Sequence, residues 1–213
     1  MIALLAGATG LVGREILHRL AGDERVAQVR ALVRRPLPSS DTAPRILECR
    51  VDFERLDANP EWFEVDTVFC ALGTTIRQAG SEEAFRRVDH DYPLAIARAA
   101  LAHGARHFLL VSALGADARS GVFYSRVKGE LEEAVRALGY PCVTIARPSV
   151  LLGDRSDRRI GEEIAKHIGW LAPARFRPVQ AARVAAALIE AAHAPVPGVR
   201  IIDNTALRSA VPA

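Results

Sequence analysis

The sequence contains little cysteine and no long apolar run. Its three cysteines, Cys49, Cys70 and Cys142, show no CxxC spacing. An odd number of cysteines without that spacing argues against a disulfide framework and against a cysteine-rich metal site. Charged residues interrupt every apolar run well before the roughly 20 residues that a membrane-spanning helix requires. These absences predict a protein of a reducing compartment that does not associate with a membrane, and the cytoplasm is the expected location.

The sequence also lacks blocks of one charge and metal-binding histidine motifs. Its 28 Lys and Arg residues and 25 Asp and Glu residues are scattered along the 213-residue chain. No basic block is interleaved with aromatic residues, so the net charge of +3 does not indicate a nucleic-acid partner. The histidines form neither an HExxH motif nor a paired-ligand spacing, and no metal site is predicted.

What is present is an alternation of short apolar runs with longer amphipathic segments. The apolar runs span residues 2–6, 29–33, 67–72, 107–112 and 142–146, and a last strand is predicted over 199–202. Apolar residues recur at helical spacing over 11–20, 82–103, 122–138 and 179–192. Strands that alternate with helices predict an α/β fold with a doubly wound parallel sheet. The first run meets glycines at once and lacks a basic leader, so it is predicted to be a buried strand.

No repeat or long linker divides the chain, so residues 1–213 are predicted to form a single domain. The pattern becomes irregular over 151–178, which contains an Arg/Asp-rich run and two prolines. We interpret this stretch as a small C-terminal elaboration that caps the substrate side, with a short helix around 162–168. The tail after Asn204 is expected to be loose.

Three glycines stand directly after the first predicted strand and directly before the first predicted helix. Gly7, Gly10 and Gly13 give a GxxGxxG spacing, which differs from GxGxxG. In this position glycines permit a sharp turn, and free N–H groups at the helix N-terminus favour a pyrophosphate. Thr9 can add a hydroxyl group. The motif therefore predicts a dinucleotide site, although a tight strand-to-helix turn without a ligand would use the same residues.

Two arginines end the second predicted strand. An NAD site usually has an acidic residue there, which accepts a hydrogen bond from the ribose 2′-hydroxyl. Arg34 and Arg35 would instead pair with a 2′-phosphate, which a carboxylate would repel. They predict NADP(H) as the cofactor. The alternative is a solvated turn before Pro36.

Tyr124 and Lys128 stand four residues apart near the start of a predicted helix, so both project from one face. A nearby ammonium lowers the pKa of a tyrosine, as general acid/base transfer to a carbonyl or alcohol requires. Ser112, at the tip of the preceding strand, is predicted to hold the substrate oxygen beside Tyr124. An ordinary surface pair is the alternative for Tyr124 and Lys128.

Taken in order, several motifs resemble the atypical or extended branch of the short-chain dehydrogenase/reductase superfamily, and within it the oxidoreductases related to the HIV Tat-interacting protein. These motifs are GATGLVG, VDFERLD, FCALGTT, RVDHDY, HFLLVSALGAD, YSRVKGELE and RPSVLLGDR. The resemblance implies a Rossmann fold, bound NADP(H) and a Ser/Tyr/Lys catalytic group. The asparagine of the superfamily's proton relay has no identifiable counterpart here.

The resemblance also implies a set of cofactor contacts. Around the pyrophosphate it places Gly7, Thr9, Gly10, Leu11 and Val12, and around the adenosine phosphate Arg34 and Arg35. Beside the adenine it places Asp52 and Phe53, beside the ribose and nicotinamide Leu72, Gly73 and Thr74, and beside the nicotinamide ring Pro148 and Val150. Phe53 could instead belong to the core, Gly73 could only turn the chain, and Pro148 could simply end a strand.

Other residues are not assigned a role in chemistry. The polar cluster of Asp89, His90 and Asp91 is interpreted as helix surface or a cap, and Cys70 as a small buried strand residue. Apolar stripes on the helices that begin at 82 and 122 suggest a homodimer.

The function expected from these features is an NADP(H)-dependent oxidoreductase that acts on a small carbonyl or alcohol, which the sequence does not identify. A non-enzymatic NADP(H)-responsive binding protein and, less favoured, a nucleotide-sugar epimerase or dehydratase are the alternatives.

Overall fold

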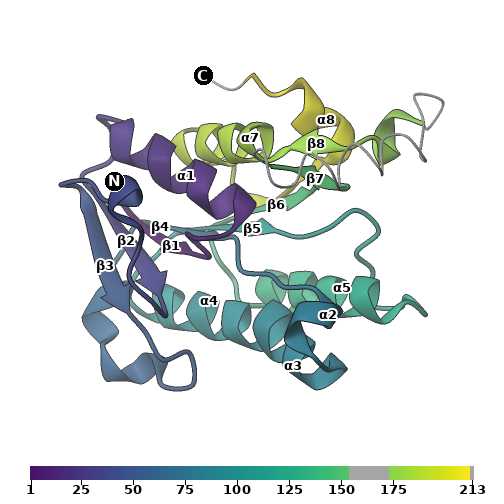
Figure 1. Ribbon diagram of the computed structural model, residues 1–213, viewed down its shortest axis with the longest axis horizontal. Helices are drawn as coiled ribbons and strands as arrows, with labels where there is room; N and C mark the ends of the chain where they lie inside the picture. Colours follow the sequence, from purple (N-terminus) through teal and green to yellow (C-terminus); the bar gives the residue numbers. More distant parts are fainter. Residues whose placement is uncertain (154–172, 212–213) are drawn as a thin grey trace.

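The computed structural model describes residues 1–153 and 173–211. Seven parallel strands form one sheet in the order β3-β2-β1-β4-β5-β6-β9 (Figure 1). Their bounds are β1 Ile2–Ala6, β2 Gln28–Val33, β3 Ile46–Arg50, β4 Thr67–Cys70, β5 His107–Val111, β6 Cys142–Arg147 and β9 Gly198–Asp203. A second, two-stranded sheet pairs β7 Leu151–Leu152 with β8 Val179–Gln180. The order reverses between β1 and β4, which confirms the predicted doubly wound, Rossmann-type fold.

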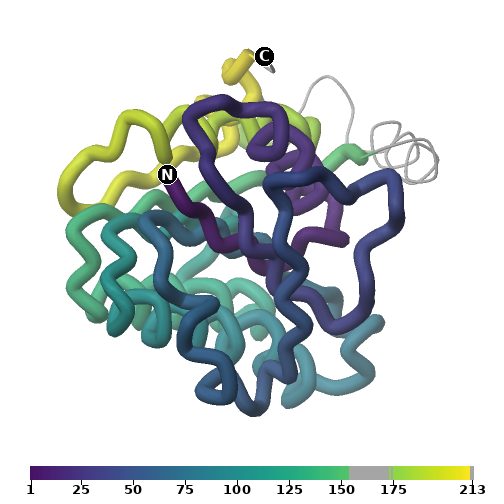
Figure 2. The backbone as a smooth tube through the Cα atoms, turned by 90° about the vertical axis from the view of Figure 1, so that its left-hand side faces the viewer, coloured from purple at the N-terminus to yellow at the C-terminus, as the bar shows by residue number. Residues whose placement is uncertain are grey.

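Helices cover both faces of the large sheet. One layer contains α1 Leu11–Gly22 and α7 Ala181–His193, which lie side by side, and the other contains α4 Tyr92–Ala102 and α5 Phe123–Ala137 (Figure 1). Figure 2, viewed from the β3 side, shows the two layers above and below the strands. The shorter helices are η1 Ser39–Asp41, η2 Leu56–Ala58, η3 Pro60–Phe63, α2 Ile76–Ala79, α3 Glu82–Arg86, the π-helix η4 Arg87–Asp91, η5 Ala174–Phe176 and α8 Asn204–Ser209.

The strands at the centre of the sheet are apolar on both sides because each side faces a helix layer. Along β5, Leu109 belongs to the core under α1 and α7, whereas Phe108 and Leu110 belong to the core over α4 and α5. All five residues of this strand are buried. Such strands give continuous apolar runs instead of an alternating pattern, which is why these runs predicted a parallel sheet correctly.

The strand β3 was not among the apolar runs. It lies at the edge of the sheet and has the sequence ILECR, in which Leu47 is 43% exposed and Cys49 is fully buried. An edge strand has fewer neighbours to cover its side chains, so charged residues interrupt the apolar pattern.

The expectation of a loose tail after Asn204 was wrong. The fully buried Asn204 side chain accepts a hydrogen bond from the Ser149 amide and donates to the Arg175 and Arg177 carbonyls. Asp203 caps the helix α8, and Leu207 in that helix is buried in the core. These contacts hold the segment in place. In the sequence, only the apolar residue Leu207 and the capping residue Asp203 indicate that it is ordered. The short helix expected around 162–168 lies outside the described residues.

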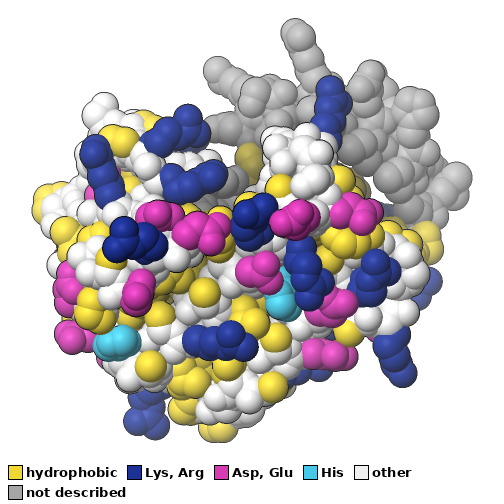
Figure 3. Space-filling view, turned by 90° about the horizontal axis from the view of Figure 1, so that it is seen from below, with side chains coloured by type: hydrophobic (Ala, Val, Ile, Leu, Met, Phe, Trp, Pro, Cys, Tyr) yellow, Lys and Arg dark blue, Asp and Glu magenta, His cyan; other side chains and the backbone are white. Residues whose placement is uncertain are grey.

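The layer of α4 and α5 carries charged side chains of both signs with hydrophobic side chains between them (Figure 3). This face shows no large area of one charge. The predicted homodimer through these helices stays a prediction.

A buried histidine predicts acid sensitivity of the fold. His107 is 3% exposed at the start of β5; its Nε2 bonds to Thr144 Oγ1 at 2.9 Å, and its Nδ1 has no partner among the described residues. Burial lowers the pKa of His107 to about 4 from its ordinary 6.5. Between pH 6.5 and pH 4 the unfolded chain binds more protons than the folded chain. The free energy of unfolding should therefore decrease as the pH is lowered, by at most about 1.4 kcal/mol per pH unit.

Urea unfolding at several pH values from about 7 to about 5 would measure this effect. His107→Gln can still bond to Thr144 but does not titrate, so its stability should depend less on pH. The exposed His103 provides the matched control, His103→Gln. Equal pH slopes for the wild type and His107→Gln would contradict the prediction.

Candidate functional site

The glycine turn joins β1 to α1 at the carboxyl edge of the sheet. Gly7 has a φ of +89°, and a Cβ there would lie 2.4 Å from the Ala71 carbonyl oxygen. A Cβ at Gly13 would lie 1.9 Å from the Gly7 oxygen. Packing within the chain therefore requires both glycines. Gly10 is different, because its φ is −80° and a Cβ there would meet only the Gly7 oxygen, at 3.4 Å.

The start of α1 is suited to a phosphate. Gly10 is the N-cap residue and gives no side-chain hydrogen bond to the helix, and the first turn contains no acidic residue. Free N–H groups at a helix N-terminus attract an anion. Thr9 and Leu11 are exposed beside this turn, whereas Val12 is buried in the core, so Val12 could meet a cofactor only through its backbone. The space at Gly10 and the uncapped helix fit a pyrophosphate.

Arg34 and Arg35 follow directly after β2, and both are exposed. Within the described part of the chain, neither forms a hydrogen bond or an ion pair with another residue. Their guanidinium groups are thus available to an anion at the same edge of the sheet as the glycine turn.

The two residues expected beside the adenine have different environments in the structure. Asp52 is exposed and accepts a hydrogen bond from the Glu54 amide. The Phe53 ring is 8% exposed and stacks on Tyr92, with ring centroids 5.1 Å apart. The phenyl group therefore packs in the core against Tyr92. Its direction depends on Tyr92, a contact that the local sequence does not reveal.

Segment 72–74 follows β4 and lies against the glycine turn, since a Cβ at Gly7 would also approach the Leu72 amide at 2.8 Å. The Thr74 amide donates a 2.8 Å hydrogen bond to Asp89 Oδ2. Lys128 Nζ lies 2.7 Å from Asp89 Oδ1, and a Cβ at Gly73 would lie 3.7 Å from Lys128 Nζ. The structure thus brings the predicted ribose-side segment and the predicted catalytic lysine together.

The interpretation of Asp89 as helix surface was wrong, because its side chain is fully buried. One helix was predicted over 82–103, but the structure places the π-helix η4 between α3 and α4. The π-turn lies against α5, and Asp89 within it pairs with Lys128. Single π-turns are frequent at functional sites. Only the polar residues of RVDHDY, inside an otherwise apolar helix pattern, hinted at this feature.

Tyr124 and Lys128 both lie in the first turns of α5, as predicted. The Tyr124 ring packs against Phe85, with centroids 5.6 Å apart. Burial raises the pKa of Tyr124 above 10, Lys128 opposes this shift, and Asp89 adds to it. The expected net lowering of this pKa by Lys128 does not hold here, because burial of the hydroxyl outweighs the effect of the lysine charge and Asp89 opposes that charge.

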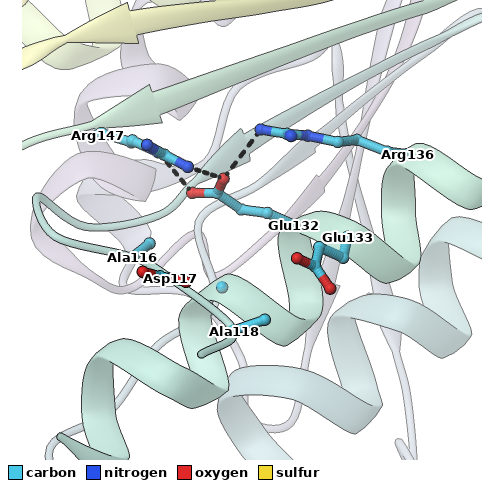
Figure 4. Close-up of a pocket in the computed structure, with 8 residues that line it drawn as sticks. Ala116, Asp117, Ala118, Glu132, Glu133, Arg136 and Arg147 are labelled. Atoms are coloured by element: carbon cyan, nitrogen blue, oxygen red, sulfur yellow. Dashed lines mark hydrogen bonds and ion pairs between the residues drawn. The ribbon is translucent and has the colours of Figure 1, made fainter. Parts of the chain in front are cut away.

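Ser112 does not have the geometry expected of a group that holds the substrate. Its buried hydroxyl donates a 2.6 Å hydrogen bond to Glu132 Oε1. Glu132 is 1% exposed and also binds Arg147, with Nε at 2.9 Å and Nη2 at 2.5 Å, while Arg136 approaches at 3.3 Å (Figure 4). A serine has one proton to donate, and here Glu132 receives it. The network joins the tip of β5 to α5 and β6.

A cavity of about 260 Å³ opens beside this network. It contains none of the predicted cofactor or catalytic residues (Figure 4). Its lining residues are Ala116, Asp117, Ala118, Gly129, Glu132, Glu133, Arg136 and Arg147.

The last predicted contacts follow β6. Pro148 is buried and accepts a hydrogen bond from the Leu114 amide, and Val150 is 36% exposed. Both lie after the carboxyl end of a central strand, which is the edge where open parallel sheets bind ligands.

Cys70, at the end of β4, is buried, and burial raises the pKa of its thiol to about 11. A protonated, buried thiol reacts slowly, which agrees with its interpretation as a small strand residue. Among the described helices, none is long and apolar enough to cross a membrane. No group of three or more His, Cys, Asp and Glu side chains within 1–153 and 173–211 could hold a metal ion.

Comparison with known families and proteins agrees with this geometry. A family model described as NAD(P)H-binding matches residues 7–195. Protein HTATIP2 of Rattus norvegicus is 40% identical over 164 residues, which are 76% of this chain and 67% of the relative. Protein FMP52, mitochondrial, of Eremothecium gossypii is 41% identical over 175 residues, covering 80% of this chain and 76% of the relative.

Solved structures share the fold at low sequence identity. MoeE5 in complex with UDP-glucose and NAD has a TM-score of 0.75 and 18% identity, covering 95% of this chain and 75% of that chain. A short-chain dehydrogenase/reductase superfamily protein from Agrobacterium tumefaciens with bound NAD has a TM-score of 0.70 and 17% identity, covering 95% and 77%. These similarities concern the fold alone.

The names of the relatives correct one expectation. Several FMP52 proteins, including those of Eremothecium gossypii and Candida albicans, are named mitochondrial, which contradicts the expected cytoplasmic location. That expectation used unpaired cysteines as evidence, but these indicate only a reducing compartment and do not say which one. The predicted resemblance itself is confirmed. The chain belongs to the family of NAD(P)H-binding, Rossmann-type proteins that includes those named HTATIP2 and FMP52.

Proposed function

We propose that this protein is an NADP(H)-dependent oxidoreductase of the short-chain dehydrogenase/reductase type. The observation that carries the proposal is the position of Lys128. Its Nζ lies beside the segment 72–74, against which the glycine turn also packs. A phosphate-binding turn, a ribose-side segment and a Tyr/Lys pair on one helix therefore meet at the carboxyl edge of the sheet.

The substrate class is a small carbonyl compound or alcohol. The bound cofactor supplies or accepts the hydride. In the direction of reduction, the Tyr124 hydroxyl donates a proton to the carbonyl oxygen, and in the reverse direction its phenolate accepts one. Lys128, one helical turn further along α5, lies close enough to the segment 72–74 to bind a ribose hydroxyl. The Ser112 hydroxyl has no part in this scheme, because it donates to Glu132.

A preference for NADP(H) over NAD(H) follows from Arg34 and Arg35. Both are exposed and unpaired within the described residues, at the end of β2, where a 2′-phosphate would lie. Because both guanidinium groups are exposed to water, their charge-assisted contacts to this phosphate would together contribute about 1.5–3 kcal/mol, which NADH cannot gain.

Replacement of both arginines should therefore remove the preference. In fluorescence titrations of cofactor-stripped protein, we expect Arg34→Ala/Arg35→Ala to weaken NADPH binding by about 10- to 100-fold and to leave NADH binding nearly unchanged. The double variant Arg98→Ala/Arg106→Ala removes the same charge. Arg98 is exposed in the second half of α4, and Arg106 is exposed just before β5, at the opposite edge of the sheet.

This control should bind NADPH like the wild type. Equal wild-type affinity for NADPH and NADH would overturn the assignment of NADP(H). No binding of either cofactor would overturn the proposed function as a whole.

A further inference from the structure

The Asp89 carboxylate lies where three segments of the candidate site meet. It belongs to the π-helix η4, it accepts a hydrogen bond from the Thr74 amide, and it pairs with Lys128 on α5. Asp89 is fully buried, and the Lys128 side chain is 5% exposed. Charges removed from water in this way cost much free energy unless they are paired, so the two groups depend on each other.

The pair controls the charge that Tyr124 experiences. Lys128 lies one turn after Tyr124 on the same face of α5, and Asp89 faces both from η4. On its other side Tyr124 meets the apolar ring of Phe85. Among the described residues, Lys128 and Asp89 are the charged groups that act on Tyr124, with opposite signs. Since water screens buried charges weakly, one carboxylate can cancel most of the effect of the ammonium.

We propose that Asp89 is a positioning residue that acts through Lys128: it holds the ammonium against the segment 72–74 and opposes the effect of its charge on the Tyr124 hydroxyl. This role rests on the proposed function, because a proton-donating Tyr124 matters only to an enzyme. Gly73 contributes to the arrangement, since a Cβ there would lie 3.4 Å from Asp89 Oδ1.

The structure also explains why a carboxylate is required at this position. An asparagine could accept the Thr74 hydrogen bond equally well, but it could not balance the ammonium. Burial raises the pKa of Asp89, and the neighbouring Lys128 opposes that shift. If Lys128 is removed, the Asp89 carboxylate acts on Tyr124 without the ammonium, and the pKa of Tyr124 should rise.

The test is a pH titration of tyrosinate absorbance, which requires neither substrate nor cofactor. We expect Asp89→Asn to lower the pKa of Tyr124 by about one unit or more, a tenfold change in the ionisation equilibrium, because the lysine charge is no longer balanced. The chain has three tyrosines, so Asp89→Asn/Tyr124→Phe identifies the transition that moves. Asp91→Asn is the matched control, since Asp91 lies in the same π-helix but is 53% exposed. It should leave the titration of Tyr124 unchanged.

A second variant covers the possibility that Asp89→Asn does not fold. Lys128→Met should raise the pKa of Tyr124, because the Asp89 carboxylate then acts without the ammonium, and Lys128→Met/Asp89→Asn, which buries no unpaired charge, should reverse that rise. A pKa of Tyr124 as high in Lys128→Met/Asp89→Asn as in Lys128→Met, or an unchanged Tyr124 titration in folded Asp89→Asn, would overturn the proposal. These results are independent of the cofactor titrations, so failure of the proposed function and failure of this role of Asp89 can be told apart.

Discussion

Tyr124→Phe is expected to lower turnover strongly and to leave cofactor binding intact. The change removes one hydroxyl group and keeps the ring that packs against Phe85. Without this hydroxyl the carbonyl oxygen has no proton donor, and the loss of general acid catalysis lowers kcat by about 10²- to 10⁴-fold. The measurement is NADPH oxidation with a panel of aldehydes, ketones and quinones, together with NADPH binding by fluorescence.

Tyr140→Phe is the matched control for this experiment. It removes the same atom from a tyrosine whose hydroxyl donates to the Ala97 carbonyl. Tyr140 lies between α5 and β6 and is distant in sequence from the glycine turn. Turnover should survive this change once the protein is confirmed to be folded. Full activity in Tyr124→Phe would show that another group transfers the proton. Wild-type protein that binds NADPH tightly but oxidises it with no carbonyl compound would favour the non-enzymatic, NADP(H)-responsive binding protein.

Among the substitutions proposed here, Glu132→Ala should cause the largest decrease in the free energy of unfolding. Its carboxylate is 1% exposed and joins Ser112 on one side to Arg147 and Arg136 on the other (Figure 4). Glu132→Ala leaves the Arg147 guanidinium, which is 28% exposed, and the buried Ser112 hydroxyl without their acceptor. Removal of one partner from a buried ion pair costs about 3–5 kcal/mol. For a chain of this size we expect Tm to fall by roughly 10 °C.

Glu133→Ala serves as the control for Glu132→Ala. Glu133 is the next residue of α5 and lines the same cavity, but it is exposed, and the described residues give it no hydrogen bond or ion pair. Its replacement should change the free energy of unfolding by less than about 0.5 kcal/mol. Both variants would be compared by urea unfolding and thermal melts. A Glu132→Ala protein as stable as Glu133→Ala would show that the network contributes little to the fold.

The sequence by itself determined the fold class, the glycine turn and the position of the Tyr/Lys pair. Each of these depends on local patterns. Apolar runs indicate strands that are covered on both faces, and the three glycines indicate a sharp turn between a strand and a helix. A four-residue spacing places Tyr124 and Lys128 on one face of a helix. The edge strand β3 was missed because an exposed edge does not keep a continuous apolar run.

Only the tertiary structure decided which polar groups meet. The direction of the Ser112 hydroxyl depends on Glu132, the burial of the Phe53 ring depends on Tyr92, and the role of Asp89 depends on Lys128. In each case the partner lies on another element of the fold, and for Asp89 a π-turn changes the face on which the side chain lies. Residue spacing in the sequence indicates the periodicity within one helix or strand. A buried charge or hydroxyl group, in contrast, is stabilised by a partner that the packing of separate elements places beside it.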